Sequence, residues 1–186
     1  MAKKTTTTIS ITFPSKYYVC GADLSLKRPA WCVLYVNKEG TSPVIEIKKI
    51  LSVDNKTNRT KTHGQLLEEI QQAFSTLISG LEPDTYFVRE TEVLHMKVPS
   101  ERDVSKVVGI MDLMLWKFMH KEWYGIYPTT VKKLITGSGR AEKDDVAAGL
   151  EKYAGKQEYK CDDESDATAV AVAWLIQQGE IKGESV

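Results

Sequence analysis

Four carboxylates stand directly before an apolar run in the stretch CDDESDATAVAVAWL, residues 161–175. Acids are common at a helix N-terminus, where they meet the positive end of the helix macrodipole, and Asp163 could cap the free N–H groups there. Asp163 and Asp166 are three residues apart, so a helix would place them on one side. Both carboxylates would then be available to bind a metal ion. The stretch alone leaves helix capping and metal binding open.

Two further carboxylates interrupt apolar strand patterns. Asp23 lies in YYVCGADL, residues 17–24, and Glu90 lies in DTYFVRETEV, residues 84–93. Each has a structural alternative, because Asp23 could cap the following turn and Glu90 could pair with Arg89 or with a lysine on a neighbouring strand. If the two strands are adjacent and parallel, both acids lie near the same end of the sheet.

Carboxylates that meet at one point repel one another and raise one another's pKa unless cations neutralise them. Oxygen ligands suit Mg²⁺ or Mn²⁺. Two such ions about 3.5–4 Å apart stabilise both the attacking and the leaving oxygen of a phosphoryl displacement. If the helix that carries Asp163 and Asp166 docks beside Asp23 and Glu90, the sequence predicts a two-metal centre for phosphodiester chemistry.

The elements that would position these acids follow from hydrophobic periodicity. Three β-rich runs joined by short links predict an antiparallel meander, and a helix-length crossover predicts that the fourth strand runs parallel to the first. Thr62 and Ser100 are the expected N-caps of the first two helices. The order β-β-β-α-β-α-β-α with a C-terminal helix predicts an α/β fold with one mixed five-stranded sheet flanked by helices. The expected elements are strands at 17–24, 30–37, 44–53, 84–93 and 123–128, helices at 64–81, 100–123, 141–154 and 163–178, and a basic connection at 129–143.

Length and composition predict a flexible N-terminal tail over residues 1–16 and a single domain over 17–186. The chain has 186 residues, of which 42% are hydrophobic and 27% are charged, as is ordinary for a soluble domain. Three cysteines without CxxC spacing predict reduced thiols and a cytoplasmic location. No apolar stretch approaches the roughly 20 residues of a membrane helix, so no membrane partner is expected.

Charge and apolar residues are unevenly distributed along the chain. Residues 97–143 carry nine basic and five acidic side chains, whereas residues 144–186 carry four and ten. A basic surface beside an acidic site would suit a phosphate-bearing ligand, although ordinary solvated charge explains the split equally well. The helix at 100–123 is apolar over much of its surface, which favours either a homodimer contact or deep burial in the monomer.

Four blocks together resemble the RuvC family of Holliday-junction resolvases, which have the RNase H-like fold of the retroviral integrase superfamily. The resemblance runs from about residue 17 to 178, and the compact, divergent chain would suit a phage-type member. The last two blocks are the most specific, through their order, spacing and local sequence. The blocks are GADLS, LEPDTYFVRE, VKKLITGSGRAEKDDV and DESDATAVAVAWL.

The resemblance implies a Mg²⁺-dependent endodeoxyribonuclease that cuts four-way DNA symmetrically as a homodimer. The apolar surface of the 100–123 helix makes that helix the expected dimer contact. Family members hold two Mg²⁺ ions with four acids, and Mn²⁺ is expected to substitute. Glu92 competes with Glu90 for one position, although the spacing after Pro83-Asp84 favours Glu90. The catalytic and metal-binding acids matched by motif are Asp23, Glu90, Asp163 and Asp166.

The same resemblance implies a set of DNA-binding residues. The family's lysines in the VK and AEK blocks match Lys132 and Lys143, and Lys133 and Arg140 are expected to assist them. Each would contact phosphate, which gives affinity and register without sequence readout.

Two departures from the family pattern bear on substrate choice. The usual Asp-Pro-Gly after the first strand is Asp23-Leu24-Ser25, and residues 93–96 carry no aromatic where the family has one. Both favour weaker sequence preference or a broader range of branched DNA. The alternatives are an RNase H-like nuclease for flaps, forks or RNA–DNA hybrids, and a non-catalytic junction-binding protein. A sugar-kinase or actin-like ATPase would need a second domain.

Overall fold

The sheet has five strands in the order β3-β2-β1-β4-β5, in a computed structural model that describes residues 11–56, 60–91 and 99–183. The first three strands form an antiparallel meander, and β4 and β5 add to it in parallel. This topology confirms the predicted mixed five-stranded α/β fold. The strands are β1 (Lys16–Asp23), β2 (Ala30–Asn37), β3 (Val44–Ser52), β4 (Thr85–Glu90) and β5 (Tyr124–Ile126).

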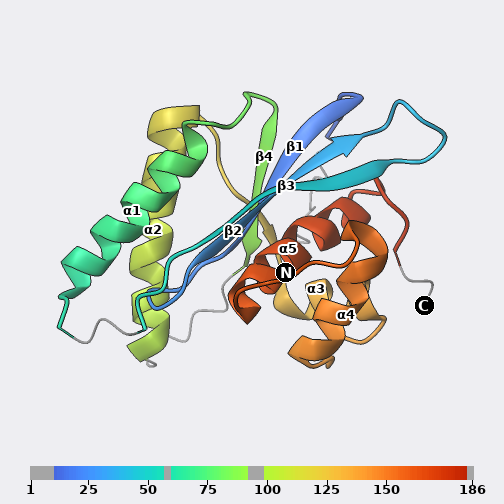
Figure 1. The fold of residues 1–186 in the computed structure, drawn as a ribbon. Coiled ribbons are helices and arrows are strands. Elements are labelled where there is room, and N and C mark those ends of the chain that lie inside the picture. Colours follow the sequence, from blue (N-terminus) through green and yellow to red (C-terminus); the bar gives the residue numbers. More distant parts are fainter. Residues whose placement is uncertain (1–10, 57–59, 92–98, 184–186) are drawn as a thin grey trace, which may run out of the picture.

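Helices cover both faces of the sheet (Figure 1): α1 and α2 lie on one side, and α3, α4 and α5 lie on the other. Thr62 is the N-cap of α1, as predicted, and it forms a capping box with Gln65. The predicted N-cap at Ser100 is wrong, because α2 begins at Pro99 and Ser100 is its second residue. The helices are α1 (His63–Ile78), α2 (Pro99–Met119), α3 (Pro128–Thr136), α4 (Lys143–Ala154) and α5 (Asp162–Gln177).

The prediction of a mere connection at 129–143 is wrong, because its first half folds as α3. Pro128 is the first helical residue, where its fixed φ and missing N–H are no disadvantage. Val131 and Ile135 lie one turn apart and are both buried, which anchors the helix. Gly137 ends it with a φ of 79°. Gly137 and Gly139 favoured the prediction of a connection, although Pro128 is a typical first residue of a helix.

Side chains of β1 alternate between the two cores. Cys20 and Ala22 face the cluster that contains α1 and α2, whereas Tyr17 and Val19 face the cluster that contains α5. Asp23 continues the second series, so the strand directs its carboxylate toward the α5 side of the sheet.

Helix α5 packs against β1 with almost no space between the two backbones. A Cβ atom added at Gly21 would lie 2.3 Å from the carbonyl oxygen of Ala167 and 2.8 Å from the Cβ of Ala171. The residues of α5 from Ala167 to Leu175 are all buried. Gly21 therefore sets how closely α5 approaches the strand that ends in Asp23.

We expect Gly21→Val to lower the free energy of unfolding by roughly 1–3 kcal/mol, because the added atoms meet helix backbone that cannot rotate away. Urea unfolding measures this change. Gly64→Ala is the control, since its Cβ would meet only the Thr62 hydroxyl at 3.8 Å. Equal stability of the Gly21→Val protein and the unmodified chain would contradict the close approach.

Part of the predicted N-terminal tail lies within the described residues. The Phe13 ring lies 5.0 Å from Tyr17, 4.9 Å from Tyr86 and 5.5 Å from Trp174, measured between ring centroids. Residues 11–15 thus extend the α5-side core, while residues 1–10 lie outside the described range. None of the helices in the described ranges combines the length and apolar character that a bilayer span requires.

Candidate active site

Asp23 and Glu90 end two neighbouring parallel strands. The register pairs Ala22 of β1 with Arg89 of β4, so the next residue on each strand is a carboxylate. Strands in a sheet lie about 4.8 Å apart. Val88 belongs to the α5-side core and Glu90 shares its face, whereas Arg89 turns to the other face and pairs with Asp112 of α2. Both acids thus lie at the C-terminal ends of their strands and point to the same face of the sheet.

The first two turns of α5 carry the other two predicted acids. Cys161 occupies the N-cap position and its side chain makes no capping hydrogen bond, so Asp163 is not the N-cap considered from sequence. Asp163 and Asp166 are both partly buried, with side-chain exposures of 19% and 26%. The helix therefore presents these carboxylates toward the strand ends.

The raised pKa values of Asp23 and Glu90 show that these acids are buried and lie near other carboxylates. Burial raises the pKa of Asp23 to about 7, and repulsion from Asp166, Glu90 and Asp163 adds to the effect. Burial likewise raises the pKa of Glu90 to about 7, again with repulsion from Asp166. The structure thus brings all four predicted acids into one electrostatic cluster, here called the acid cluster (Asp23, Glu90, Asp163 and Asp166).

Two of the four predicted DNA-binding residues lie at the acid cluster. Lys143 donates a hydrogen bond of 2.8 Å from Nζ to Oδ2 of Asp166. Lys132 donates to the carbonyl oxygen of Ala141 at 2.7 Å and, with Lys143, opposes the rise in the pKa of Glu90. Lys133 and Arg140 are exposed instead.

The remaining acids of the opening stretch have different roles. The carboxylate of Glu164 is buried and accepts hydrogen bonds from the Ser52 hydroxyl at 2.7 Å and from the Lys160 backbone N–H at 2.9 Å. Glu164 therefore fastens the start of α5 to the end of β3, a role that the sequence analysis missed. Asp162 is 74% exposed on its side chain. Sequence alone did not predict that Asp162 is more exposed than Asp166, because the two lie four residues apart on the same side of the helix.

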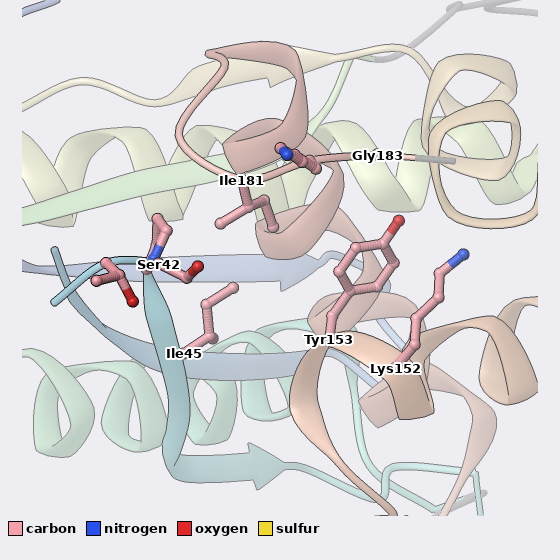
Figure 2. A pocket seen from close by; sticks show the side chains of 9 residues that line it. Ser42, Ile45, Lys152, Tyr153, Ile181 and Gly183 are labelled. Atoms are coloured by element: carbon pink, nitrogen blue, oxygen red, sulfur yellow. The ribbon is translucent and has the colours of Figure 1, made fainter. Parts of the chain in front are cut away.

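A pocket of about 350 Å³ opens beside the acid cluster. Asp23 and Glu90 line it together with Leu24, Thr91 and Pro128, among others. A larger pocket of about 590 Å³ lies between the β2–β3 loop, the end of α4 and residues 181–183 (Figure 2). Lys152 and Tyr153 line that pocket, and none of its lining residues is a carboxylate. Of these two pockets, only the smaller one is lined by members of the acid cluster.

The acid cluster offers hard oxygen donors whose mutual repulsion a divalent cation would relieve. Within the described ranges, no group of three or more His, Cys, Asp or Glu side chains is arranged so that it could hold a metal ion. Lys143 provides a positive charge at Asp166 in this arrangement. Glu92, the competitor of Glu90, and residues 93–96 lie outside the described residues.

Comparison with known proteins gives consistent matches. The family model described as crossover junction endodeoxyribonuclease RuvC matches residues 32–174. RuvC of Ehrlichia ruminantium is 28% identical over 157 residues, which cover 84% of this chain and 95% of that protein. Thermus thermophilus RuvC has the same fold, with a TM-score of 0.70 at 19% identity over 90% of this chain and 99% of that one. Its complex with a Holliday junction substrate superposes with a TM-score of 0.69 at 18% identity, over the same shares of the two chains.

Proposed function

This chain belongs to the RuvC family of crossover junction endodeoxyribonucleases, and we propose that its acid cluster holds the metal ions and carries the cleavage chemistry. The protein is an endonuclease that resolves Holliday junctions. The observation that carries the site assignment is the pair of acids with pKa values of about 7 at adjacent strand ends, both repelled by Asp166. Asp23 lies before residue 32, where the family match begins, so its assignment depends on this geometry.

We infer that two divalent ions, Mg²⁺ or in its place Mn²⁺, are held by Asp23, Glu90, Asp163 and Asp166. When bound, such ions activate water and stabilise the attacking and leaving oxygens of the scissile phosphate. The partly buried carboxylates contribute oxygen donors on two rigid strand ends and one helix turn. Lys143 must leave Asp166 before that oxygen can serve as a ligand, and it is then free to contact phosphate.

The basic residues around the cluster fit the backbone of branched DNA. We propose that Lys132, Lys133, Arg140 and Lys143 contact phosphates on either side of the cleaved bond. Lys133, Arg140 and Lys143 are exposed, Lys143 also binds Asp166, and Lys132 and Lys143 both act on the pKa of Glu90. We propose that the protein acts in the cytoplasm, where DNA is present and cysteines stay reduced.

Lys133→Ala should weaken junction binding and reduce the slope of log K against log salt concentration by about 0.9, as the loss of one phosphate contact predicts. The turnover rate at saturating junction should not change. Fluorescence anisotropy over a salt series measures the slope, with Lys49→Ala, an exposed lysine on β3, as the control. An unchanged slope would remove Lys133 from the DNA-binding surface.

One side of α2 supports the predicted homodimer. Val107, Met111 and Leu115 pack into the core of the monomer. On the outside, Leu113 is 58% exposed and Trp116 is 54% exposed, and they lie three residues apart on one helix face. Because large exposed apolar side chains at helical spacing mark interaction surfaces, we propose that a second copy of the chain covers them.

Trp116→Glu should convert the dimer into a monomer, because a charge would be placed inside the proposed interface. Paired symmetric nicks, which need two active sites, would be lost, while the thermal melting temperature of the monomer fold would change little. Light scattering coupled to gel filtration measures the mass. Val44→Glu, at a 54% exposed position on β3, is the matched control. A dimer that persists with Trp116→Glu contradicts this surface.

A panel of branched substrates tests the function itself. Four-way, three-way, flap, fork and RNA–DNA hybrid substrates are cut in Mg²⁺ and in EDTA, and the nicks are mapped. We expect paired nicks at symmetric positions of the four-way junction, with no cleavage in EDTA. Faster cleavage of flaps, forks or hybrids would favour the alternative nuclease function.

A further inference from the structure

The turn between β1 and β2 is held by contacts that replace the expected Asp-Pro-Gly geometry. Asn55 is 5% exposed, and its side-chain Nδ2 donates to the carbonyl oxygen of Leu26 at 3.1 Å. The backbone N–H of Asn55 donates to the carbonyl oxygen of Lys27 at 2.8 Å. Within the turn, Ser25 Oγ accepts a hydrogen bond of 2.9 Å from the backbone N–H of Arg28. The segment that follows β3 therefore fixes the backbone position of Arg28.

The Arg28 side chain bridges two carboxylates. Its Nη2 lies 3.0 Å from Oδ2 of Asp54, and its Nη1 lies 3.9 Å from Oδ2 of Asp163. The side chain is 23% exposed, so the turn and the start of α5 cover most of it. Asp54 is itself held by a 2.9 Å hydrogen bond from the Lys56 backbone N–H to Oδ1. Arg28 thus connects a fixed surface acid to one member of the acid cluster.

We propose that Arg28, held in place by Asp54, is a positioning residue that orients the Asp163 carboxylate for divalent-metal binding. This inference rests on the proposed function of the acid cluster. Arg28 approaches Oδ2 of Asp163, so Oδ1 stays available to an ion. Groups that orient a metal ligand in this way typically change metal affinity by about 10- to 100-fold when they are removed.

The net charge of the Arg28–Asp54 pair decides whether the pair strengthens or weakens metal binding. An isolated guanidinium near a metal site would repel the ion and weaken its binding. Asp54 cancels that charge at 3.0 Å, so the Arg28–Asp54 pair is neutral as a unit. The pair therefore supplies orientation at Asp163 with little net repulsion. Its removal should weaken metal binding, because Asp163 then samples rotamers that do not face the other acids.

The test is a charge-neutral double variant, Arg28→Gln with Asp54→Asn, which removes the bridge without changing net charge. Its control is Lys16→Gln with Glu39→Gln, which removes an exposed ion pair at the opposite end of β1. Binding of Mn²⁺ is followed by the electron paramagnetic resonance signal of the free ion. The Mg²⁺ dependence of cleavage and the junction affinity in EDTA are measured in parallel.

We expect the double variant to bind Mn²⁺ about tenfold more weakly than the unmodified protein and to need a correspondingly higher Mg²⁺ concentration for half-maximal cleavage. Cleavage at saturating Mg²⁺ should recover, and junction affinity in EDTA should not change. Arg28→Lys, which keeps the charge but loses the planar fork, should have an intermediate effect and serves if the double variant fails to fold. Mn²⁺ affinity within twofold of the unmodified protein overturns the proposal, as does weaker junction binding in EDTA.

The outcome separates this inference from the function of the acid cluster. If Asp166→Asn abolishes cleavage while the double variant binds Mn²⁺ normally, only the positioning role of Arg28 fails. If Asp166→Asn cleaves normally, the acid cluster is not the active site and the Arg28 proposal fails with it.

Discussion

Replacing Asp166 with Asn should slow Mg²⁺-dependent junction cleavage by about a thousandfold or more, while junction affinity stays within about twofold. Asp166 repels both Asp23 and Glu90, so it interacts with both strand-end members of the acid cluster. Its amide replacement has the same shape but lacks the negative charge that a divalent ion requires. The measurement is single-turnover cleavage of a four-way junction, with binding followed separately in EDTA.

Asp162→Asn is the matched control for this variant. Asp162 lies one helical turn before Asp166 and 3.9 Å from the same Lys143 amino group, yet its side chain is 74% exposed. We expect its replacement to leave the cleavage rate nearly unchanged. Cleavage by the Asp166→Asn protein at the rate of the unmodified protein would refute the catalytic assignment.

The second large effect concerns stability in the absence of metal. Asp23 has a pKa of about 7 in the folded protein and about 3.8 when exposed, mainly because burial disfavours its charge. The folded state therefore binds a proton more tightly than the unfolded state. The resulting penalty is absent below about pH 4, grows as the pH rises, and is complete above about pH 7. It amounts to at most about 4 kcal/mol.

Asp23→Asn should therefore stabilise the metal-free protein at pH 8, by an amount that shrinks toward pH 4. Mg²⁺ should stabilise the unmodified protein at pH 8 but have little effect on this variant, because a ligand is lost. Urea unfolding at both pH values, in EDTA and in Mg²⁺, measures all four states. If the Asp23→Asn protein is less stable than the unmodified protein by the same amount at both pH values, burial of the Asp23 carboxylate does not destabilise the fold.

Both predictions depend on where the acids of the cluster lie, and strand and helix periodicity predicted most of these positions. The crossover before β4 predicted that β4 runs parallel to β1, and side-chain alternation then put Asp23 and Glu90 on one face. The spacing of Asp163 and Asp166 placed them together on α5. These inferences succeed because strand period, helix period and crossover length each leave few geometric alternatives.

Other features of the site depend on tertiary contacts that periodicity does not encode. The contact of Gly21 with the α5 backbone requires knowledge of which helix lies on β1. Lys143 stays a predicted phosphate contact, but its hydrogen bond to Asp166 in the folded chain could not be predicted from residue spacing. Arg28 lies close to Asp163 in a turn that is held in part by Asn55, a residue remote in sequence. The start of α3, in contrast, has a sequence signal, because proline is common at the first position of a helix.

Anomalous diffraction from crystals of the protein bound to a junction in Mn²⁺ tests the acid cluster most directly. We expect two Mn²⁺ peaks about 3.5–4 Å apart. Carboxylate oxygens of Asp23, Glu90, Asp163 and Asp166 should ligate them, and the Lys143 amino group should have moved away from Asp166. Manganese bound elsewhere, or a cluster without manganese in which Lys143 still pairs with Asp166, would contradict the proposed metal centre.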